Sequence, residues 1–389
     1  MKLDFHALRV RAVQADTAEA VVVSFDVPEA LRPVFGFTQG QYLTLRKRIG
    51  GQELRRSYSI CAGVDDGELR VGVRKVQGGV FSNWINEHLL PGDRVDVMAP
   101  QGRFFVPLDA ALSRHHVGIA GGSGITPVLS IMKTVLAREP QSCFTLIYGN
   151  RRPDSTMFKE ELDDLKNRHL ARLAVHHVFS QEGDAPLAGL LAPLGGPPEA
   201  QPQMPEPPQA LDEGAPLHQG LMDRHKIARF LGSVLPAAGI DEAYVCGPFQ
   251  MNDEAEAALL AAGVAKERIH IERFGVPLPV GAVGAVLHEA APGDAPTARI
   301  VIVRDGVRRE VPFIKGQPSI LDAATAAGLD LPFSCTSGVC GTCRARCLEG
   351  RVRMERNFAL DPSDLEAGFV LTCQAHPLTE RVVLSFDDR

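Results

Sequence analysis

The 389-residue chain lacks long hydrophobic runs and any excess of positive charge. No stretch approaches the ~18 uninterrupted apolar residues of a transmembrane helix, and the N-terminal segment MKLDFHALRVRA lacks the apolar core of a secretory signal. The net charge is −6 and the basic residues are scattered, which gives no electrostatic surface for nucleic acid. We therefore predict a cytoplasmic protein that binds neither nucleic acid nor membrane.

The composition divides the chain into four parts, and the length suits two or three domains of about 150 residues each. Residues 1–108 hold short β-branched runs between turn signals, which is typical of an antiparallel β-barrel. Residues 109–275 alternate predicted strands and helices, as a parallel α/β sheet does. Residues 276–297 are rich in Pro, Gly and Ala and are predicted to be a linker to a final domain, residues 298–389.

A proline-rich insert interrupts the α/β part. Residues 186–216 contain nine prolines and neither Lys nor Arg. Such a segment cannot bury enough apolar surface to offset the entropy lost on ordering. We interpret it as a mobile loop that precedes a helix capped by Asp223.

The final part has the pattern of a small β-grasp domain. A predicted hairpin, ARIVIVRDGVRREVPF, turns at Asp305-Gly306. A helix is then predicted to begin at Ser319, with Asp322 in the capping-box position, and to end at Gly328. A cysteine-rich loop follows, and this order of elements suggests a ferredoxin module.

Four cysteines in this part have the spacing of a plant-type [2Fe–2S] site. Cys335, Cys340 and Cys343 are spaced C-x4-C-x2-C, and Cys373 follows after 29 further residues. A zinc site usually draws its thiolates from two separate C-x2-C pairs, and a disulfide framework suits an oxidising compartment. The spacing therefore favours a cluster that carries single electrons. A fifth cysteine, Cys347, is expected to be a buried core thiol.

A cluster takes one electron at a time whereas a nicotinamide delivers a hydride, so we expect a flavin upstream to convert between them. The segment Arg56-Ser57-Tyr58-Ser59 resembles the R-x-Y-S flavin motif of the ferredoxin-NADP reductase superfamily. The resemblance implies that Arg56 binds the FAD pyrophosphate, that Tyr58 packs against the isoalloxazine and that Ser59 lies near the flavin N5. A guanidinium fork suits phosphate, and a flat phenol suits a flat ring.

A second segment, VGVRKVQGGVFSNWI at 71–85, resembles the family segment that opens a helix under the FAD phosphates. Free N–H groups at a helix N-terminus suit a dianion. A simple turn and helix is the alternative. The resemblance assigns FAD binding to Gly78, Gly79, Phe81 and Ser82.

The α/β part contains AGGSGITP at 120–127, between a predicted strand and helix. It resembles the family's G-x-G-x-x-P loop at the NAD(P) pyrophosphate, and it departs from G-x-G-x-x-G at the last position. A proline there suits the first helical turn, where its missing N–H is not needed. The implied nucleotide-binding residues are Gly122, Gly124, Thr126 and Pro127.

Two later segments resemble those that approach the nicotinamide and the flavin in this family. Cys246-Gly247-Pro248 follows a strand at the end where open α/β sheets bind ligands, although Cys246 could also be a small buried apolar residue. The segment IERFG at 271–275 assigns Glu272 and Phe274 to the flavin side. The candidate catalytic residues are then Tyr58, Ser59 and Cys246.

The coenzyme is predicted from the residues after the second α/β strand. Arg151 and Arg152 occur where an NAD site would carry an acidic residue for the ribose 2′-OH, and no acidic residue comes before Asp154. Two arginines favour the 2′-phosphate of NADPH, with NADH possible and ordinary surface arginines as the alternative.

The order of barrel, nucleotide domain and C-terminal ferredoxin resembles the reductase components of bacterial oxygenases. The resemblance implies electron flow from NADPH through FAD and the cluster to the metal centre, expected to be diiron, of an oxygenase partner. The C-terminal stretch is most similar to reductases of phenylacetyl-CoA ring epoxidation in phenylacetate degradation. The alternatives are a reductase for another hydroxylase, of steroids or aromatic compounds, and a zinc-stabilised binding module that is no enzyme.

Charge after the cysteine loop suggests a docking surface. Five arginines follow the loop closely, and they predict either a basic surface that steers an acidic partner or an ordinary solvated strand face. These residues are Arg344, Arg346, Arg351, Arg353 and Arg356.

Overall fold

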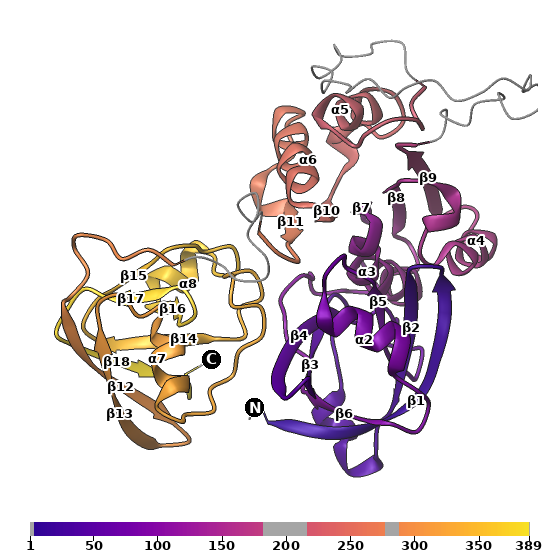
Figure 1. The fold of residues 1–389 in the computed structure, drawn as a ribbon. Coiled ribbons are helices and arrows are strands. Elements are labelled where there is room, and N and C mark those ends of the chain that lie inside the picture. The colour runs from indigo at the N-terminus through magenta and orange to yellow at the C-terminus, as the bar shows by residue number, and fades with distance from the viewer. Residues whose placement is uncertain (1–3, 182–215, 277–287, 389) are drawn as a thin grey trace, which may run out of the picture.

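The structure is a computed structural model that describes residues 4–181, 216–276 and 288–388. Nearly all of the predicted proline-rich insert (186–216) and half of the predicted linker (276–297) lie outside the described residues. The strands form a six-stranded sheet, two five-stranded sheets and a two-stranded sheet, arranged as three successive domains along the chain (Figure 1). None of the described helices is both long enough and apolar enough to span a bilayer.

The first domain is the predicted antiparallel barrel. Its sheet has the order β4-β3-β6-β1-β2-β5 with antiparallel neighbours, and an isolated bridge between Ile60 and Val71 joins its two ends. Helix α2 packs Phe81 and Ile85 into the barrel core. The elements are β1 (Phe5–Thr17), β2 (Ala20–Asp26), a 3-10 turn (Glu29–Leu31), α1 (Arg32–Phe35), β3 (Tyr42–Ile49), β4 (Gln52–Ser59), β5 (Leu69–Arg74), α2 (Val80–His88) and β6 (Arg94–Met98).

The second domain is the predicted parallel α/β sheet, with the order β11-β10-β7-β8-β9. Helices α3 and α4 pack in one core and α5 and α6 in another, so both faces of the sheet are covered, which explains the apolar strand sequences. The main elements are β7 (His115–Gly121), α3 (Ile125–Arg138), β8 (Cys143–Asn150), α4 (Lys159–Arg168), β9 (Leu173–Phe179), α5 (Arg224–Ser233), β10 (Glu242–Cys246), α6 (Phe249–Ala261) and β11 (Ile269–Glu272). Short 3-10 turns lie at Gly122–Gly124, Pro153–Ser155, Ala237–Gly239 and Lys266–Arg268.

Two local details of this domain bear on the sequence predictions. The Asp223 side chain accepts a hydrogen bond from the backbone N–H of Lys226 and caps α5, as predicted. Phe158 directly precedes α4 with φ 58°, and its N–H donates to Asp16 of the barrel. A contact with another domain therefore sets the start of α4, and the local periodicity could not show it.

The third domain has the predicted β-grasp arrangement, with the sheet order β13-β12-β18-β14-β16 and a small β15-β17 pair beside it. Asp305 and Gly306 both have positive φ, at 52° and 73°, as the predicted tight turn requires. Ser319 caps α7 through the N–H of Asp322. The elements are β12 (Thr297–Arg304), β13 (Val307–Ile314), α7 (Ile320–Ala326), β14 (Arg344–Glu349), β15 (Val352–Met354), α8 (Pro362–Glu366), β16 (Phe369–Leu371), β17 (Ala375–Pro377) and β18 (Arg381–Ser385).

The barrel and the α/β domain share one hydrophobic core. Helix α3 packs its buried face both on the sheet of its own domain and on barrel residues that include Val22, Phe104 and Val106. Because of this common core, the loop between β7 and α3 has a fixed position relative to the barrel.

Candidate electron-transfer site

The four predicted cluster ligands converge in the third domain. Cys335, Cys340 and Cys343 lie on the loop between α7 and β14, and Cys373 lies between β16 and β17. Cys343 and Cys373 are buried, whereas Cys335 and Cys340 are partly exposed. The Cys335 sulfur contacts the Cys340 and Cys373 thiols, and these hydrogen bonds hold the pKa of Cys335 well below its usual range. One thiol of the group is therefore poised to act as a thiolate.

The backbone around these sulfurs has the form that a cluster needs. Thr336, Gly338 and Gly341 all have positive φ, so the loop curls around its own thiols. The Ser337 N–H donates to Cys335 Sγ at 3.4 Å, and the Gln374 amide lies 3.6 Å from Cys373 Sγ. Hydrogen bonds to the ligand sulfurs are a general feature of iron–sulfur sites.

Although Cys335 contacts two of the other thiols, no three of the four sulfurs lie mutually within 4.8 Å, as the ligands of a single zinc ion would. With Zn–S bonds of about 2.3 Å, a tetrahedral site places its sulfurs roughly 3.8 Å apart. Within the described parts of the chain, the one set of three potential ligand atoms lying mutually within 4.8 Å contains no cysteine. The four thiols thus fit a binuclear cluster better than one ion.

The cysteine loop is docked directly on the barrel. The Tyr42 hydroxyl donates to the Cys340 carbonyl at 2.5 Å and lies 2.9 Å from the Thr342 hydroxyl. Ser57 donates to Ser334 at 2.8 Å. The buried Arg55 guanidinium binds the Leu331 carbonyl at 3.1 Å and lies 4.3 Å from the centre of the Phe333 ring. Further along the contact, Arg103 forms an ion pair with Asp364.

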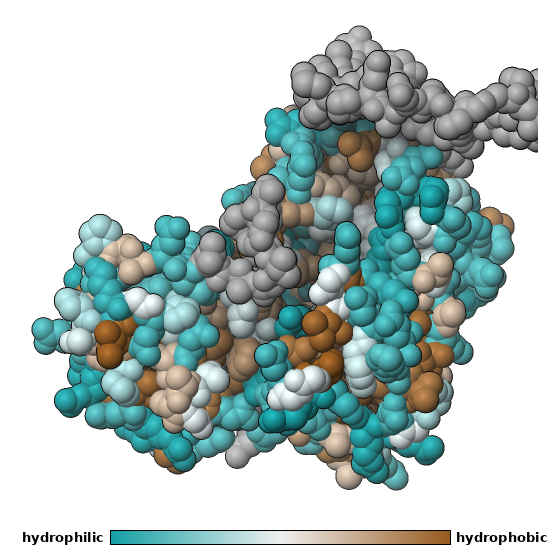
Figure 2. Space-filling view, viewed as in Figure 1, coloured by the Kyte–Doolittle hydropathy of each residue, from teal (hydrophilic) through white to brown (hydrophobic). Residues whose placement is uncertain are grey.

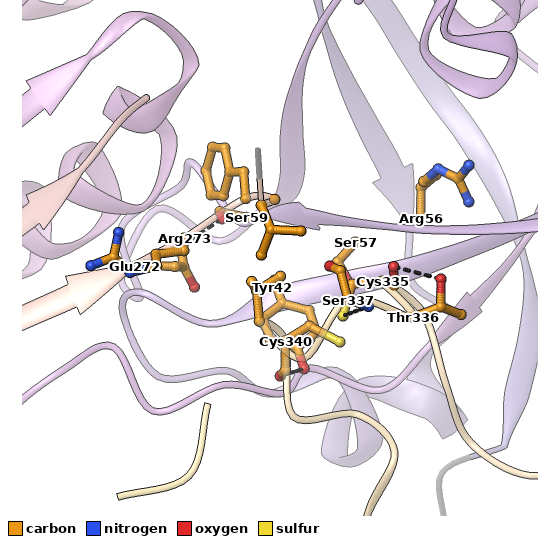
Figure 3. A pocket seen from close by; sticks show the side chains of 14 residues that line it. Tyr42, Arg56, Ser57, Ser59, Glu272, Arg273, Cys335, Thr336, Ser337 and Cys340 are labelled. Carbon is orange, nitrogen blue, oxygen red and sulfur yellow. Dashed lines mark hydrogen bonds between the residues drawn. The ribbon is translucent and has the colours of Figure 1, made fainter. Parts of the chain in front are cut away.

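One pocket is lined by all three domains (Figure 3). Its walls come from β3 and β4 of the barrel, from the end of β11 with the segment that follows it, and from the cysteine loop. Figure 2 shows that the surface is hollowed between the C-terminal domain and the rest, with apolar residues over the nearby part of the barrel. The lining residues are Tyr42, Arg56, Ser57, Ser59, Glu272, Arg273, Phe274, Gly275, Val276, Cys335, Thr336, Ser337, Val339 and Cys340.

Ser59 and Glu272 form a pair across this pocket. Ser59, at the end of β4, donates to Glu272 Oε2 at 3.0 Å. Burial raises the pKa of Glu272 to about 8, and the hydrogen bond from Ser59 offsets only part of that effect. The carboxyl is therefore largely protonated at neutral pH and can hold a proton where the predicted flavin ring would lie.

The other predicted flavin residues divide between the surface and the core. Arg56 is exposed at the pocket, where its Nη1 donates to its neighbour's backbone carbonyl at 2.7 Å. Tyr58 lies beside Phe81, with ring centroids 6.2 Å apart, and Phe81 is buried in the barrel core. Phe81 therefore contacts Tyr58 from the side of the barrel core.

The predicted phosphate-binding turn precedes α2. Gly78 has φ 72° and Gly79 is the N-cap of α2, so the first backbone N–H groups of that helix are available to an anion. The Ser82 hydroxyl is buried and accepts from the Val76 N–H at 3.2 Å. Ser82 thus holds the turn in shape, and the arrangement fits a phosphate group.

The predicted nucleotide loop touches the Cys246-Gly247-Pro248 segment. Gly122 has φ 53°, and a Cβ on Gly124 would lie 2.0 Å from the Cys246 carbonyl oxygen, so only glycine fits there. The Thr126 hydroxyl donates to the Ser123 carbonyl at 2.9 Å, and Pro127 occupies the first turn of α3, as predicted. The two loops after β7 and β10 therefore form one continuous surface.

Cys246 itself is completely buried in the core shared with α3. Burial raises the pKa of its thiol well above the usual value, so the side chain is neutral. This placement agrees with the apolar alternative considered for Cys246, and it equally leaves a small, uncharged group behind the surface where a nicotinamide would bind.

The two arginines that were predicted to select the coenzyme are exposed and already form ion pairs. Arg151 binds Glu19 at 2.7 Å, and Arg152 binds Asp154 at 3.2 Å. Glu19 also binds Arg74 at 2.8 Å, and a Cβ on Gly122 would lie 2.9 Å from the Arg74 guanidinium. Arg74 thus lies over the nucleotide loop, which the sequence did not indicate.

A second contact that the sequence did not indicate joins the α/β domain to the C-terminal domain. Phe249, which follows Cys246-Gly247-Pro248, meets Phe358 edge to face at 5.5 Å. The Arg273 guanidinium lies 4.3 Å from the Phe249 ring centre and 5.5 Å from that of Phe358. The Phe358 N–H in turn donates to Gly338 of the cysteine loop. No local signal could reveal a contact between residues so far apart in sequence.

The predicted basic surface is smaller than the sequence suggested. Arg344 forms an ion pair with the buried Asp364 at 2.8 Å, and Arg353 with the buried Asp294 at 2.7 Å. Arg346 and Arg351 are exposed. The strand face therefore presents fewer uncompensated charges than five neighbouring arginines imply. Cys347, expected to be buried, lies partly exposed against the core of this domain.

Comparison with known protein families agrees with this three-part arrangement. An oxidoreductase FAD-binding domain matches residues 8–106, an oxidoreductase NAD-binding domain matches 119–189, and a 2Fe-2S iron-sulfur cluster binding domain matches 302–378. The chain belongs to the FAD- and [2Fe–2S]-containing reductase components of oxygenases, within the ferredoxin reductase family. This assignment sets aside the alternative of a non-enzymatic zinc module.

Individual relatives place the chain more closely within this family. It is 40% identical to one of the subunits of 1,2-phenylacetyl-CoA epoxidase from Escherichia coli K12 over 383 residues, which is 98% of each chain. It is 32% identical to the ferredoxin reductase component of 3-ketosteroid-9-alpha-monooxygenase from Rhodococcus rhodochrous, over 97% of this chain and 96% of the other. Phthalate dioxygenase reductase has the same fold, with a TM-score of 0.56 and 21% identity over 98% of both chains.

Proposed function

We propose that this chain takes electrons from NADPH and delivers them, through FAD and a [2Fe–2S] cluster, to the oxygenase component of a phenylacetyl-CoA ring epoxidase. When bound, FAD accepts a hydride and releases its electrons singly, and the cluster carries one electron at a time. The observation that carries the proposal is the single pocket onto which the R-x-Y-S strand, the Glu272 segment and the cysteine loop all open.

Residues of the barrel would hold the flavin in this pocket. Arg56 and the N-terminus of α2 would bind the FAD pyrophosphate, and Tyr58 would pack against the isoalloxazine ring. Ser59 and Glu272 would keep a proton beside the ring, since the Glu272 carboxyl is largely protonated at neutral pH. Phe274, 47% exposed at the rim, would shield the ring from water.

The cluster would be held by Cys335, Cys340, Cys343 and Cys373. Tyr42 fixes the Cys340 carbonyl against the barrel, so the ligand loop and the predicted flavin site keep a constant separation. The short path between them favours transfer within one chain.

NADPH would bind along the loops that follow β7 and β10, with Gly122, Gly124, Thr126 and Pro127 at the pyrophosphate and Cys246-Gly247-Pro248 at the nicotinamide. Arg151 and Arg152 would exchange their carboxylate partners for the 2′-phosphate, because both are exposed and their ion pairs are weak. NADH would bind less tightly.

The partner assignment rests on the 40% identity, over nearly the whole chain, to the epoxidase relative from Escherichia coli. We expect a diiron centre in that partner and a cytoplasmic location, where thiols stay reduced and pyridine nucleotides are available. All eight cysteines are unpaired in the structure, which fits that compartment.

Reconstitution tests the proposal. The purified reductase is mixed with the oxygenase component of a phenylacetyl-CoA epoxidase, or with a 3-ketosteroid 9α-hydroxylase, and product is measured with NADPH. We expect turnover with the epoxidase and far less with the hydroxylase. The steroid pairing, which the 32% identity to the steroid-enzyme reductase keeps as a second candidate, would be favoured by the reverse result.

A further inference from the structure

Three side chains with metal-binding groups meet in the C-terminal domain, away from the cysteine loop. His288 lies before β12, Glu355 directly follows β15, and His376 lies in β17, paired across from Arg353. Their side chains are 9%, 11% and 2% exposed. Two imidazoles and a carboxylate buried together form a set that proteins use for divalent zinc.

The distances within this group suit an ion. His288 Nδ1 lies 2.9 Å from Glu355 Oε2, His376 Nε2 lies 3.0 Å from Glu355 Oε1, and one ligand atom from each residue lies within 4.8 Å of the other two. Bonds of about 2.0–2.1 Å to a tetrahedral zinc place neighbouring ligand atoms roughly 3.3 Å apart. Small shifts of these side chains would therefore bring the ligand atoms to the distances found around a bound zinc ion.

One nitrogen of the group is buried and unsatisfied. His376 Nε2 has no hydrogen-bond partner despite lying 3.0 Å from Glu355 Oε1, because the two atoms are not aligned for a hydrogen bond. A buried polar atom without a hydrogen-bond partner destabilises the folded protein. The Glu355 carboxylate already accepts hydrogen bonds from His288 Nδ1 and from the Glu289 N–H, and an ion beside it would give His376 Nε2 the partner that it lacks.

The surroundings also favour a cation. Asp294 Oδ2 lies 3.9 Å from His376 Nδ1, on the other ring nitrogen, which is where a supporting carboxylate of a metal-bound histidine is found. Arg353 binds Asp294 at 2.7 Å and comes within 4.0 Å of Glu355. The two carboxylates, Asp294 and Glu355, outnumber the one guanidinium, Arg353, by one negative charge.

We propose that His288, Glu355 and His376 bind one Zn²⁺ ion, whose fourth position would be left to a water molecule. The ion would tie the chain at its entry into the C-terminal domain to β15 and β17, close after the predicted ligand Cys373. This site shares no residue with the pocket lined by all three domains, so the zinc proposal is independent of the proposed function.

Calorimetric titration of the tag-free holoprotein with ZnCl₂ tests the site, with the visible absorbance of flavin and cluster followed in parallel. His288→Ala and the isosteric Glu355→Gln are compared with His225→Ala, which removes an exposed histidine on α5. We expect the wild type and H225A to bind one Zn²⁺ per chain with equal affinity. H288A and E355Q should bind at least about tenfold more weakly, since even supporting residues of metal sites contribute 10–100-fold.

Three results would overturn the proposal. One is a wild type that takes up no zinc, which would mean that His288, Glu355 and His376 only contact one another. Another is equal binding by H288A, E355Q and the wild type. The third is uptake that occurs only as cluster absorbance is lost, which would place the zinc on the cysteines. Unchanged visible absorbance in each variant shows that the C-terminal domain is still folded.

Discussion

Replacing Tyr42 with Phe should loosen the cysteine loop from the barrel without disturbing either fold. The substitution removes one hydroxyl that donates to the Cys340 carbonyl at 2.5 Å and lies 2.9 Å from Thr342 Oγ1, and it keeps the ring. Each hydrogen bond contributes a net 0.5–1.5 kcal/mol, so the loop should lose about 1–3 kcal/mol of docking free energy. At about 1.4 kcal/mol per factor of ten, the opening equilibrium should rise roughly 5–150-fold.

Hydrogen exchange of the backbone amides near Cys340 measures this opening directly. Tyr244→Phe is the matched control, because it removes another buried hydroxyl, 3.4 Å from His116, inside the α/β sheet. We expect faster exchange in the loop of Y42F alone, together with slower reduction of the cluster by NADPH and an unchanged rate with ferricyanide. Equal loop protection in Y42F and the wild type, or the same loss in Y244F, would refute the reasoning.

Three further substitutions test individual assignments. Arg56→Ala should lose about 1.5–3 kcal/mol of FAD binding if its guanidinium holds the pyrophosphate, so flavin should be released on gel filtration; normal retention would reject this role. Neutralising Arg151 and Arg152 together should raise the KM for NADPH much more than that for NADH, and equal changes would exclude a 2′-phosphate contact. The pKa of Glu272 is raised from 4.5 to about 8 in the folded protein, so folding retains a proton between these values and stability should fall as pH rises across that window. In the apoprotein, Glu272→Gln should flatten the decline of Tm from pH 5 to 8, and an unchanged slope would show that this carboxyl is not the cause.

Local signals in the sequence were sufficient to predict the main helices, strands and turns of each domain. The Ser319 and Asp223 caps, the Asp305-Gly306 turn and the alternation of strands and helices depend on neighbouring residues, and the structure has them where they were predicted. The same holds for the convergence of the four cysteines. In each case the physical cause lies within a few residues or within one small fold.

The contacts between domains could not be predicted in this way. Tyr42 and Cys340 are 298 residues apart, and Phe249 and Phe358 belong to different domains, so only the matching of two finished surfaces brings them together. The same reason explains why Phe158 lies just before α4, outside the helix. Within the third domain, tertiary packing turns Arg344 inward to Asp364. The roles assigned to individual cofactor residues stay predictions, since they depend on the bound groups.

The central claim is that electrons leave this chain through the cluster held by the four cysteines, and Cys373→Ser tests it most directly. A serine oxygen is a poor substitute for a thiolate on iron, so the variant should lose iron and cluster absorbance while the barrel keeps its flavin. We predict that it still oxidises NADPH with ferricyanide, which can take electrons from the flavin, and fails to support the partner oxygenase. Turnover of the oxygenase at the wild-type rate with the cluster absent would contradict the account, because electrons would then be leaving from the flavin.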